Sequence, residues 1–154
     1  MLRDRINDAV KLAMKAREAD RLSALRMITA ALKDREIAAR TEPGGGGPLG
    51  EEQIFQVLQK MIKQREDSAA QFTQGNRPEL AAKEEAEIGI CREFLPQAMD
   101  AGEVEAAVRA VVAEVGAQSV KDMGKVMGAL KARFTGRMDF GKANVVVKGM
   151  LGAS

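Results

Sequence analysis

Residues 54–72 read Ile54-Phe-Gln-Val-Leu-Gln-Lys-Met-Ile-Lys-Gln-Arg-Glu-Asp-Ser-Ala-Ala-Gln-Phe72, and this stretch decides the fold. Mostly apolar residues recur in it every three or four positions, which is the spacing of one face of an α-helix. The predicted inner face comprises Ile54, Leu58, Met61, Ile62, Arg65, Ala69 and Phe72. Because an apolar face needs a partner to bury it, the stretch predicts a long helix packed among other helices.

On the N-terminal side, a loop precedes this helix. Its sequence, Thr41-Glu-Pro-Gly-Gly-Gly-Gly-Pro-Leu-Gly50, combines glycines and prolines that disfavour a helix. Two earlier helices are predicted from apolar residues at helical spacing, with Asp20 as the cap of the second. Their inner faces comprise Leu2, Ile6, Val10 and Ala13, and then Leu22, Leu25, Ile28 and Leu32.

On the C-terminal side, the sequence Gln74-Gly-Asn-Arg-Pro78 predicts a turn, and a fourth helix that starts near Pro78. We expect this helix to end at Pro96, because proline lacks a backbone N–H donor. Its predicted inner face comprises Ile88, Cys91 and Leu95. Residues 1–96 are therefore predicted to form an N-terminal domain that resembles a four-helix bundle.

A smaller tail domain of three helices is predicted for residues 97–154. Its apolar residues at helical spacing are Val104, Val108, Val111, Val112 and Val115, then Met123, Val126, Met127, Leu130 and Phe134, and finally Ala143, Val147, Met150 and Leu151. Gly116 and Gly136 are expected to end the first two helices, and Ser119 with Asp122 resembles a capping box. The three valines 145–147 would also suit a strand, but no partner strand is apparent. The predicted fold class is therefore all-α throughout.

Charge is unevenly distributed along the chain, although its formal net value is only +2. Residues 1–40 carry 10 basic and 6 acidic side chains, residues 41–117 carry 7 and 14, and residues 118–154 carry 7 and 2. Because the whole molecule has no strong basic field, binding to nucleic acid would depend on the basic ends.

Several kinds of chemistry lack the residues that they need. The chain has no histidine, and Cys91 is its single cysteine, so neither a nucleophile–base triad nor a structural zinc site is expected. We expect no catalytic residue, no metal and no cofactor. The single cysteine and the mixed charges near Met1 indicate a cytoplasmic location, and no apolar run is long enough to span a membrane.

Four separated strings resemble the GatB/YqeY family. They are Leu22-Ser-Ala-Leu-Arg-Met-Ile with Ala31-Leu-Lys33, Lys60-Met-Ile-Lys-Gln-Arg-Glu-Asp-Ser68, Glu84-Glu-Ala-Glu-Ile88 leading to Phe94-Leu-Pro96, and Ser119-Val-Lys-Asp-Met-Gly-Lys-Val-Met127. They follow the family's order over nearly the whole chain. The resemblance to YqeY-like proteins implies an all-helical protein associated with tRNA.

Residues 123–151 contain Gly124-Lys-Val-Met127, Gly136 and Val146-Val-Lys148, and through these elements they also resemble the tail domain of the B subunit of the tRNA-dependent amidotransferase. In those enzymes the helical and tail regions hold tRNA, whereas amide transfer belongs to a separate catalytic domain that this chain lacks. The resemblance implies an accessory module without chemistry of its own, whose partner is tRNA or an enzyme that forms aminoacyl-tRNA. Its oligomeric state does not follow from the sequence.

Basic residues of the tail are the first candidate binding site, since several cations on one accessible surface can neutralise RNA phosphates. These candidates are Lys121, Lys125, Lys131, Arg133, Arg137, Lys142 and Lys148. Lys121 and Lys125 are one helical turn apart, and Arg133 and Arg137 flank Gly136. The alternative is that these side chains solvate the outer faces of three small helices.

A second basic group lies within the strings that resemble the family. It comprises Arg26, Lys33, Lys60, Lys63 and Arg65, which could face one groove if their helices are neighbours. Ordinary salt bridges to nearby glutamates and aspartates, namely Glu66, Asp67, Glu84 and Glu87, would explain the same residues.

Other candidate sites have simpler explanations. The segment Gly136-Arg-Met-Asp-Phe-Gly-Lys142 nearly matches a nucleotide-binding loop, but Ala143 replaces the hydroxyl residue and a helix precedes the loop. Cys91 is expected in the apolar core rather than as a nucleophile. Glu84 and Glu87 are expected on a solvated helix surface.

Two other classes of function stay open. One is a carbon–nitrogen ligase component that uses glutamine as amido donor, although the chain offers neither the Ser-Ser-Lys set of an amidase nor the Cys-His pair of a glutaminase. The other is a protein-interaction module with an exposed apolar groove on the tail.

Overall fold

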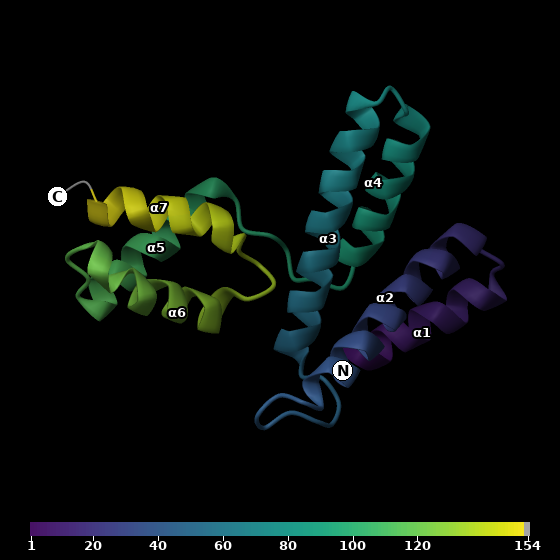
Figure 1. The fold of residues 1–154 in the computed structure, drawn as a ribbon, viewed down its shortest axis with the longest axis horizontal. Helices are drawn as coiled ribbons and strands as arrows, with labels where there is room; N and C mark the ends of the chain where they lie inside the picture. Colours follow the sequence, from purple (N-terminus) through teal and green to yellow (C-terminus); the bar gives the residue numbers. More distant parts are fainter. Residues whose placement is uncertain (153–154) are drawn as a thin grey trace. The chain divides into compact units, whose positions relative to one another are not determined.

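Helices form nearly all of the regular structure in residues 1–152, the part of the chain that the computed structural model describes. In chain order they are α1 (Leu2–Lys15), α2 (Ala19–Ala39), α3 (Glu51–Gln74), α4 (Pro78–Arg92), α5 (Ala101–Val115), the short 3₁₀ helix η1 (Val120–Asp122), α6 (Met123–Phe134) and α7 (Phe140–Gly152) (Figure 1). No strand occurs within these residues, and the three valines 145–147 lie inside α7. The prediction of an all-α fold is confirmed.

The chain divides into two units, Met1–Pro96 and Gln97–Ser154. Each unit has its own cluster of buried apolar side chains. Because an independent core is the first requirement of a domain, this division is compatible with two domains. The assignment of residues 1–96 and 97–154 as two domains stays a prediction.

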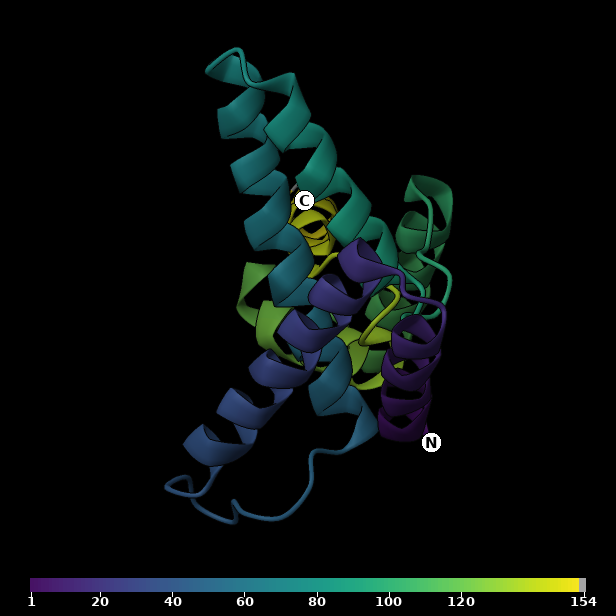
Figure 2. The same cartoon turned by 90° about the vertical axis from the view of Figure 1, so that its right-hand side faces the viewer.

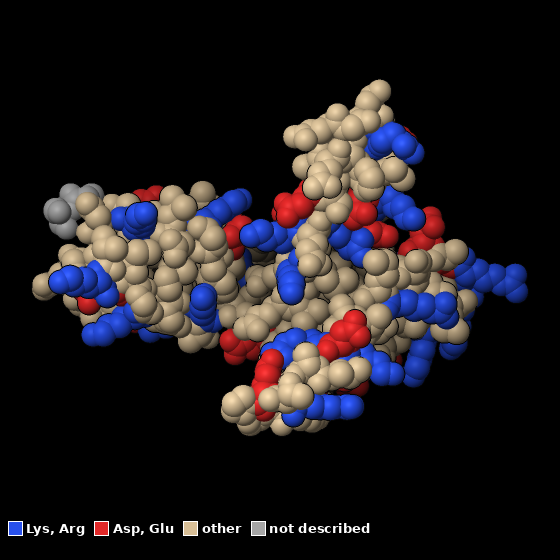
Figure 3. Space-filling view, viewed as in Figure 1, with Lys and Arg blue, Asp and Glu red and all other residues tan. Residues whose placement is uncertain are grey.

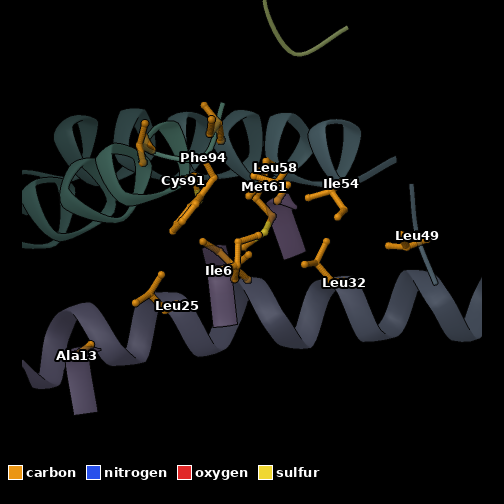
Figure 4. Close-up of a cluster of buried hydrophobic side chains, with 14 residues drawn as sticks. Ile6, Ala13, Leu25, Leu32, Leu49, Ile54, Leu58, Met61, Cys91 and Phe94 are labelled. Atoms are coloured by element: carbon orange, nitrogen blue, oxygen red, sulfur yellow. The ribbon is translucent and has the colours of Figure 1, made fainter. Parts of the chain in front are cut away.

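The N-terminal unit consists of two helical hairpins. Helix α1 lies beside α2, and α3 lies beside α4, as both Figure 1 and Figure 2 show. Residues from all four helices meet in the core, and Figure 4 labels Ile6, Ala13, Leu25, Leu32, Leu49, Ile54, Leu58, Met61, Cys91 and Phe94 among them. Ile6, Leu25, Leu32 and Leu58 are completely buried. The apolar faces predicted from helical spacing therefore point into one core.

Helix α3 buries the face that its sequence predicts. Ile54, Leu58, Met61, Ile62 and Ala69 are the buried residues of this helix. Its other two predicted members, Arg65 and Phe72, are partly buried and lie outside the core cluster. The Gly-rich segment before it forms turns and bends without a helix, as predicted.

Two predicted helix ends in the N-terminal unit were wrong. Glu18, not Asp20, is at the N-cap position of α2, so Asp20 lies in the first turn, where its charge favours the helix dipole. Helix α4 ends at Arg92; beyond it, Phe94 is buried in the core and Leu95 is half-buried against the same core. The reason is that a proline restricts the residue before it, which ends the helix earlier than its own position.

The tail unit packs α5, α6 and α7 around a small core. Val108, Val126, Leu130 and Val147 are completely buried there. Its helix ends are capped by carboxylates: the Asp122 carboxylate accepts the backbone N–H groups of Gln118 and Ser119, at 3.0 and 3.4 Å. Gly116 ends α5 in the left-handed conformation, with φ of 67°. The sequence therefore positions the ends of these helices locally.

Two capping carboxylates of the tail were missed in the sequence. Asp100 caps α5, because its side chain accepts the N–H of Glu103 at 2.8 Å. Asp139 precedes α7 and accepts the N–H groups of Gly141 and Lys142, at 2.9 and 3.2 Å. The signal was present for Asp100, since an acidic residue followed three positions later by glutamate is a common start of a helix.

Candidate nucleic-acid interface

Five lysines lie on the outer faces of η1, α6 and α7 in the tail. They are Lys121 on η1, Lys125 and Lys131 on α6, and Lys142 and Lys148 on α7, and all of them are exposed. The cause is local: the apolar residues of α6 and α7 turn inward, and the lysines between them point to solvent. None of these lysines makes an ion pair with any residue among 1–152. Their charges are therefore available to an anion.

Arg133 and Arg137, the two arginines of the candidate site, differ from these lysines because each forms an ion pair with a glutamate of α5. Arg133 Nη2 lies 2.5 Å from Glu114 Oε2. This hydrogen bond lowers the pKa of Glu114 and raises the pKa of Arg133. Arg137 Nη2 lies 3.7 Å from Glu103 Oε2, and its Nε donates to the backbone oxygen of Gln97 at 3.2 Å. From the sequence, the lysines and arginines of the tail form a single group of candidates. In the structure, the lysines form no ion pair within residues 1–152, whereas Arg133 and Arg137 each pair with a glutamate.

On the face seen in Figure 3, Lys and Arg side chains lie apart over residues 97–152, with few acidic side chains between them. The carboxylate nearest to this set in sequence is Asp122, whose pKa is lowered chiefly by the backbone N–H groups of Gln118 and Ser119 and less by Lys125. A ligand that contacts several of these lysines must therefore be an extended anion.

The second basic group is split by the structure. Arg26 and Lys33 on α2, and Lys60 and Lys63 on α3, are exposed. Within residues 1–152 these four make no ion pair. A groove common to all four stays a prediction.

Arg65, the fifth member of that group, is a structural residue instead. It is only 11% exposed, and its Nη1 lies 3.2 Å from Glu84 Oε2 and also contacts the Glu87 carboxylate. Its Nη2 is 3.3 Å from the sulfur of Met27. The salt-bridge explanation is therefore confirmed for Arg65. The prediction of a solvated surface for Glu84 and Glu87 was wrong, because they are 20% and 13% exposed.

Cys91 lies in the core of the N-terminal unit, as predicted. It is 2% exposed, and burial raises the pKa of its thiol. A thiol that stays protonated is a poor nucleophile. Cys91 is therefore a packing residue.

A shallow, mainly apolar hollow lies on the tail, between η1 and α7. Its lining consists of Val120, Asn144, Val145, Lys148, Gly149 and Gly152. Val145 is 71% exposed and, with Val120, is one of the large hydrophobic side chains exposed on the tail. Helical spacing could have revealed it, because Val145 and the buried Val147 lie on opposite faces of α7. The predicted apolar groove for a protein partner stays a prediction, and this hollow is its candidate position on the tail.

Comparison with known proteins assigns the family. The family model described as Yqey-like protein matches residues 3–151, which is almost the whole chain. The chain belongs to the YqeY-like family. This confirms the resemblance drawn from the four sequence strings.

Curated relatives of this YqeY-like chain come from yeasts, and each is called "Altered inheritance of mitochondria protein 41, mitochondrial". The Saccharomyces cerevisiae protein is 32% identical over 88 residues, 57% of this chain and 45% of its own length. The Lachancea thermotolerans protein is 34% identical over 96 residues, 62% of this chain and 49% of its own length. The Meyerozyma guilliermondii protein is 35% identical over 86 residues, 56% and 42% of the two lengths.

This YqeY-like chain thus matches slightly less than half the length of these relatives. Their name places the relatives in mitochondria, whereas the cytoplasmic location expected for this chain stays a prediction. Among residues 1–152, no helix is both long and apolar enough to cross a membrane.

Proposed function

We propose that this chain is an RNA-binding accessory module whose tail contacts the phosphates of tRNA. The observation that carries the proposal is the set of exposed tail lysines that form no ion pair within residues 1–152. The choice of tRNA among RNAs rests on the similarity of residues 123–151 to the tail of the amidotransferase B subunit. An enzyme that forms aminoacyl-tRNA would be the natural protein partner of such a module.

Phosphate contact suits lysines on separate helices. A lysine ammonium is a point charge on a flexible stem, so it can reach a phosphate without a fixed geometry. Each phosphate that is neutralised releases counterions, which makes the affinity fall with salt concentration. Since the tail offers no tyrosine or tryptophan on which bases could stack, the binding we propose depends on backbone shape and charge.

The exposed cations of the N-terminal unit are a second, separate candidate for phosphate contact. Lys60 and Lys63 lie one turn apart on α3, and Arg26 and Lys33 lie two turns apart on α2. Because all four are exposed without an ion pair within residues 1–152, they are open to phosphate in the same way as the tail lysines. We assign them the weaker role, because acidic residues follow closely in sequence: Asp34 and Glu36 after Lys33, and Glu66 and Asp67 after Lys63.

The deciding experiment measures binding of bulk tRNA at two salt concentrations. The test variant changes Lys121, Lys125 and Lys131 to glutamine, which removes three positive charges from η1 and α6. We expect its affinity to fall by at least tenfold at low salt. The slope of log affinity against log salt concentration should become shallower by the amount that about two phosphate contacts contribute.

A matched control changes Lys11, Lys15 and Lys83 to glutamine. These lysines are also exposed and lie on helices of the N-terminal unit, outside both proposed groups. The control alters the net charge equally, so its affinity should stay within about twofold of the unaltered protein. Equal losses in both variants, or no tRNA binding by the unaltered protein at low salt, would refute tail-mediated binding.

Docking of another protein is the second candidate function, and the exposed Val145 beside Val120 favours it. An apolar contact in this hollow would show little dependence on salt. Salt dependence of binding therefore distinguishes a protein partner from RNA.

A further inference from the structure

We propose that Glu114 and Glu103 compete with RNA phosphates for Arg133 and Arg137, and so limit the affinity of the tail for RNA. The inference rests on the proposed function. In this proposal, α5 affects RNA binding indirectly. Its glutamates are repelled by phosphates, but they pair with arginines that could otherwise bind phosphates.

The geometry places one competitor beside each arginine. Glu114 lies in the last turn of α5 and holds Arg133 near the end of α6, at 2.5 Å. Glu103 lies in the first turn of the same helix and is 3.7 Å from Arg137. One helix therefore supplies both carboxylates, and they occupy the two tail cations best suited to a phosphate.

These pairs are exposed, so another anion can replace the carboxylate. The side chains of Arg133 and Glu114 are 48% and 55% exposed, and those of Arg137 and Glu103 are 40% and 51% exposed. Exposed ion pairs contribute little net free energy, because water already solvates both charges. A guanidinium binds phosphate in the same forked geometry as a carboxylate. Exchange is therefore feasible, but RNA gains less from a paired arginine than from a free lysine.

The two competitors differ in strength. The guanidinium of Arg133 has Glu114 as its single hydrogen-bond acceptor among the described residues, whereas Arg137 also donates to the backbone oxygen of Gln97 at 3.2 Å. Removal of Glu114 would thus release Arg133 completely, while removal of Glu103 would leave Arg137 tethered. We expect the larger effect at Glu114.

The same helix provides a control of identical charge. Glu105 also lies on α5 and is exposed, but it pairs with Arg109 one turn along the same helix, at 2.8 Å. Arg109 is outside the proposed site. Glu105→Gln therefore removes the same negative charge from α5 without releasing either arginine of the site.

The experiment compares tRNA affinity and its salt dependence for the full chain with Glu114→Gln, Glu103→Gln or Glu105→Gln. The Glu114→Gln variant should bind tRNA up to about fivefold more tightly. The slope of its log affinity against log salt concentration should be steeper by the amount that nearly one phosphate contact contributes. Glu103→Gln should give a smaller gain, and Glu105→Gln less than about 1.5-fold. Adding Arg133→Gln to Glu114→Gln should abolish the gain, which shows that the gain acts through this arginine.

Equal gains for Glu114→Gln and Glu105→Gln would overturn the competition, because net charge alone would then explain both. That result would leave tRNA binding by the lysines intact. Absence of tRNA binding in every protein, including the unaltered one, would instead remove the proposed function together with this inference. Since the altered side chains are exposed, the far-UV circular dichroism of each variant should match that of the unaltered chain.

Discussion

At the scale of single residues, Arg65 joins three helices of the N-terminal unit. Its guanidinium on α3 contacts the carboxylates of Glu84 and Glu87 on α4 and the sulfur of Met27 on α2. The two carboxylates are a turn apart on one helix and would repel each other if the guanidinium were absent. Because all three charged groups are largely buried, loss of one partner leaves charges that water reaches poorly.

We predict that Arg65→Leu lowers the free energy of unfolding by about 2–3 kcal/mol. Leucine keeps an apolar side chain but has no charge. The lost free energy of unfolding would therefore come mainly from the carboxylates of Glu84 and Glu87, which no longer have a cation beside them. Urea unfolding followed by circular dichroism measures it.

Arg92 provides the comparison for this prediction. It pairs with Glu66 between the same two helices at 3.1 Å, but the side chains are 62% and 52% exposed. Arg92→Leu should therefore lower the free energy of unfolding by less than about 0.5 kcal/mol. Similar losses for Arg65→Leu and Arg92→Leu would show that burial does not set the contribution of the Arg65 cluster.

At the scale of helices, two glycines of the tail unit show how position decides the effect of one change. Gly116 ends α5 with φ of 67°, a conformation that an L-residue with a side chain adopts at a cost. Gly128 lies inside α6, where a residue with a side chain would favour the helix. A Cβ added at either position meets no heavy atom within 4 Å, so backbone conformation alone distinguishes the two sites.

We predict opposite effects of the same substitution at these positions. Gly128→Ala should raise the free energy of unfolding of the tail unit by about 0.5–1 kcal/mol, and Gly116→Ala should lower it by about 1 kcal/mol. Thermal or urea unfolding of the two variants checks this. Destabilisation by Gly128→Ala would indicate that the exposed side of α6 is covered by a partner in solution.

At the scale of the whole molecule, each unit contains the parts that an independent domain requires. The N-terminal core draws on α1 to α4 and the tail core on α5 to α7. The tail is the less secure of the two, because a domain of about 60 residues buries a smaller share of its surface than a larger one.

We predict that residues 1–96 and residues 97–154 fold as separate proteins. Each fragment should show helical circular dichroism and one cooperative unfolding transition, with a midpoint close to the corresponding transition of the intact chain. A fragment without cooperative unfolding would show that its core depends on the other unit.

The sequence by itself determined the fold class, the loop at residues 41–50 and most of the buried helix faces. These features are local, because the periodicity of α3 or the glycines before it act within a few neighbouring residues. The sequence strings also sufficed to recognise the YqeY-like family. The helix ends were predicted less well. Leu95 was expected on the inner face of α4, but the helix ends earlier, and in the short turn that follows it Phe94 is the buried residue.

Only the tertiary structure decided which cations of the candidate site are free. Arg65 with Glu84, and Arg133 with Glu114, are pairs of residues 19 positions apart on different helices. In the sequence all of these arginines and lysines carry the same positive charge, and no local pattern indicates which of them meets a carboxylate. Packing of one helix against another sets these distances, so the division between paired arginines and free lysines exists only in the folded protein.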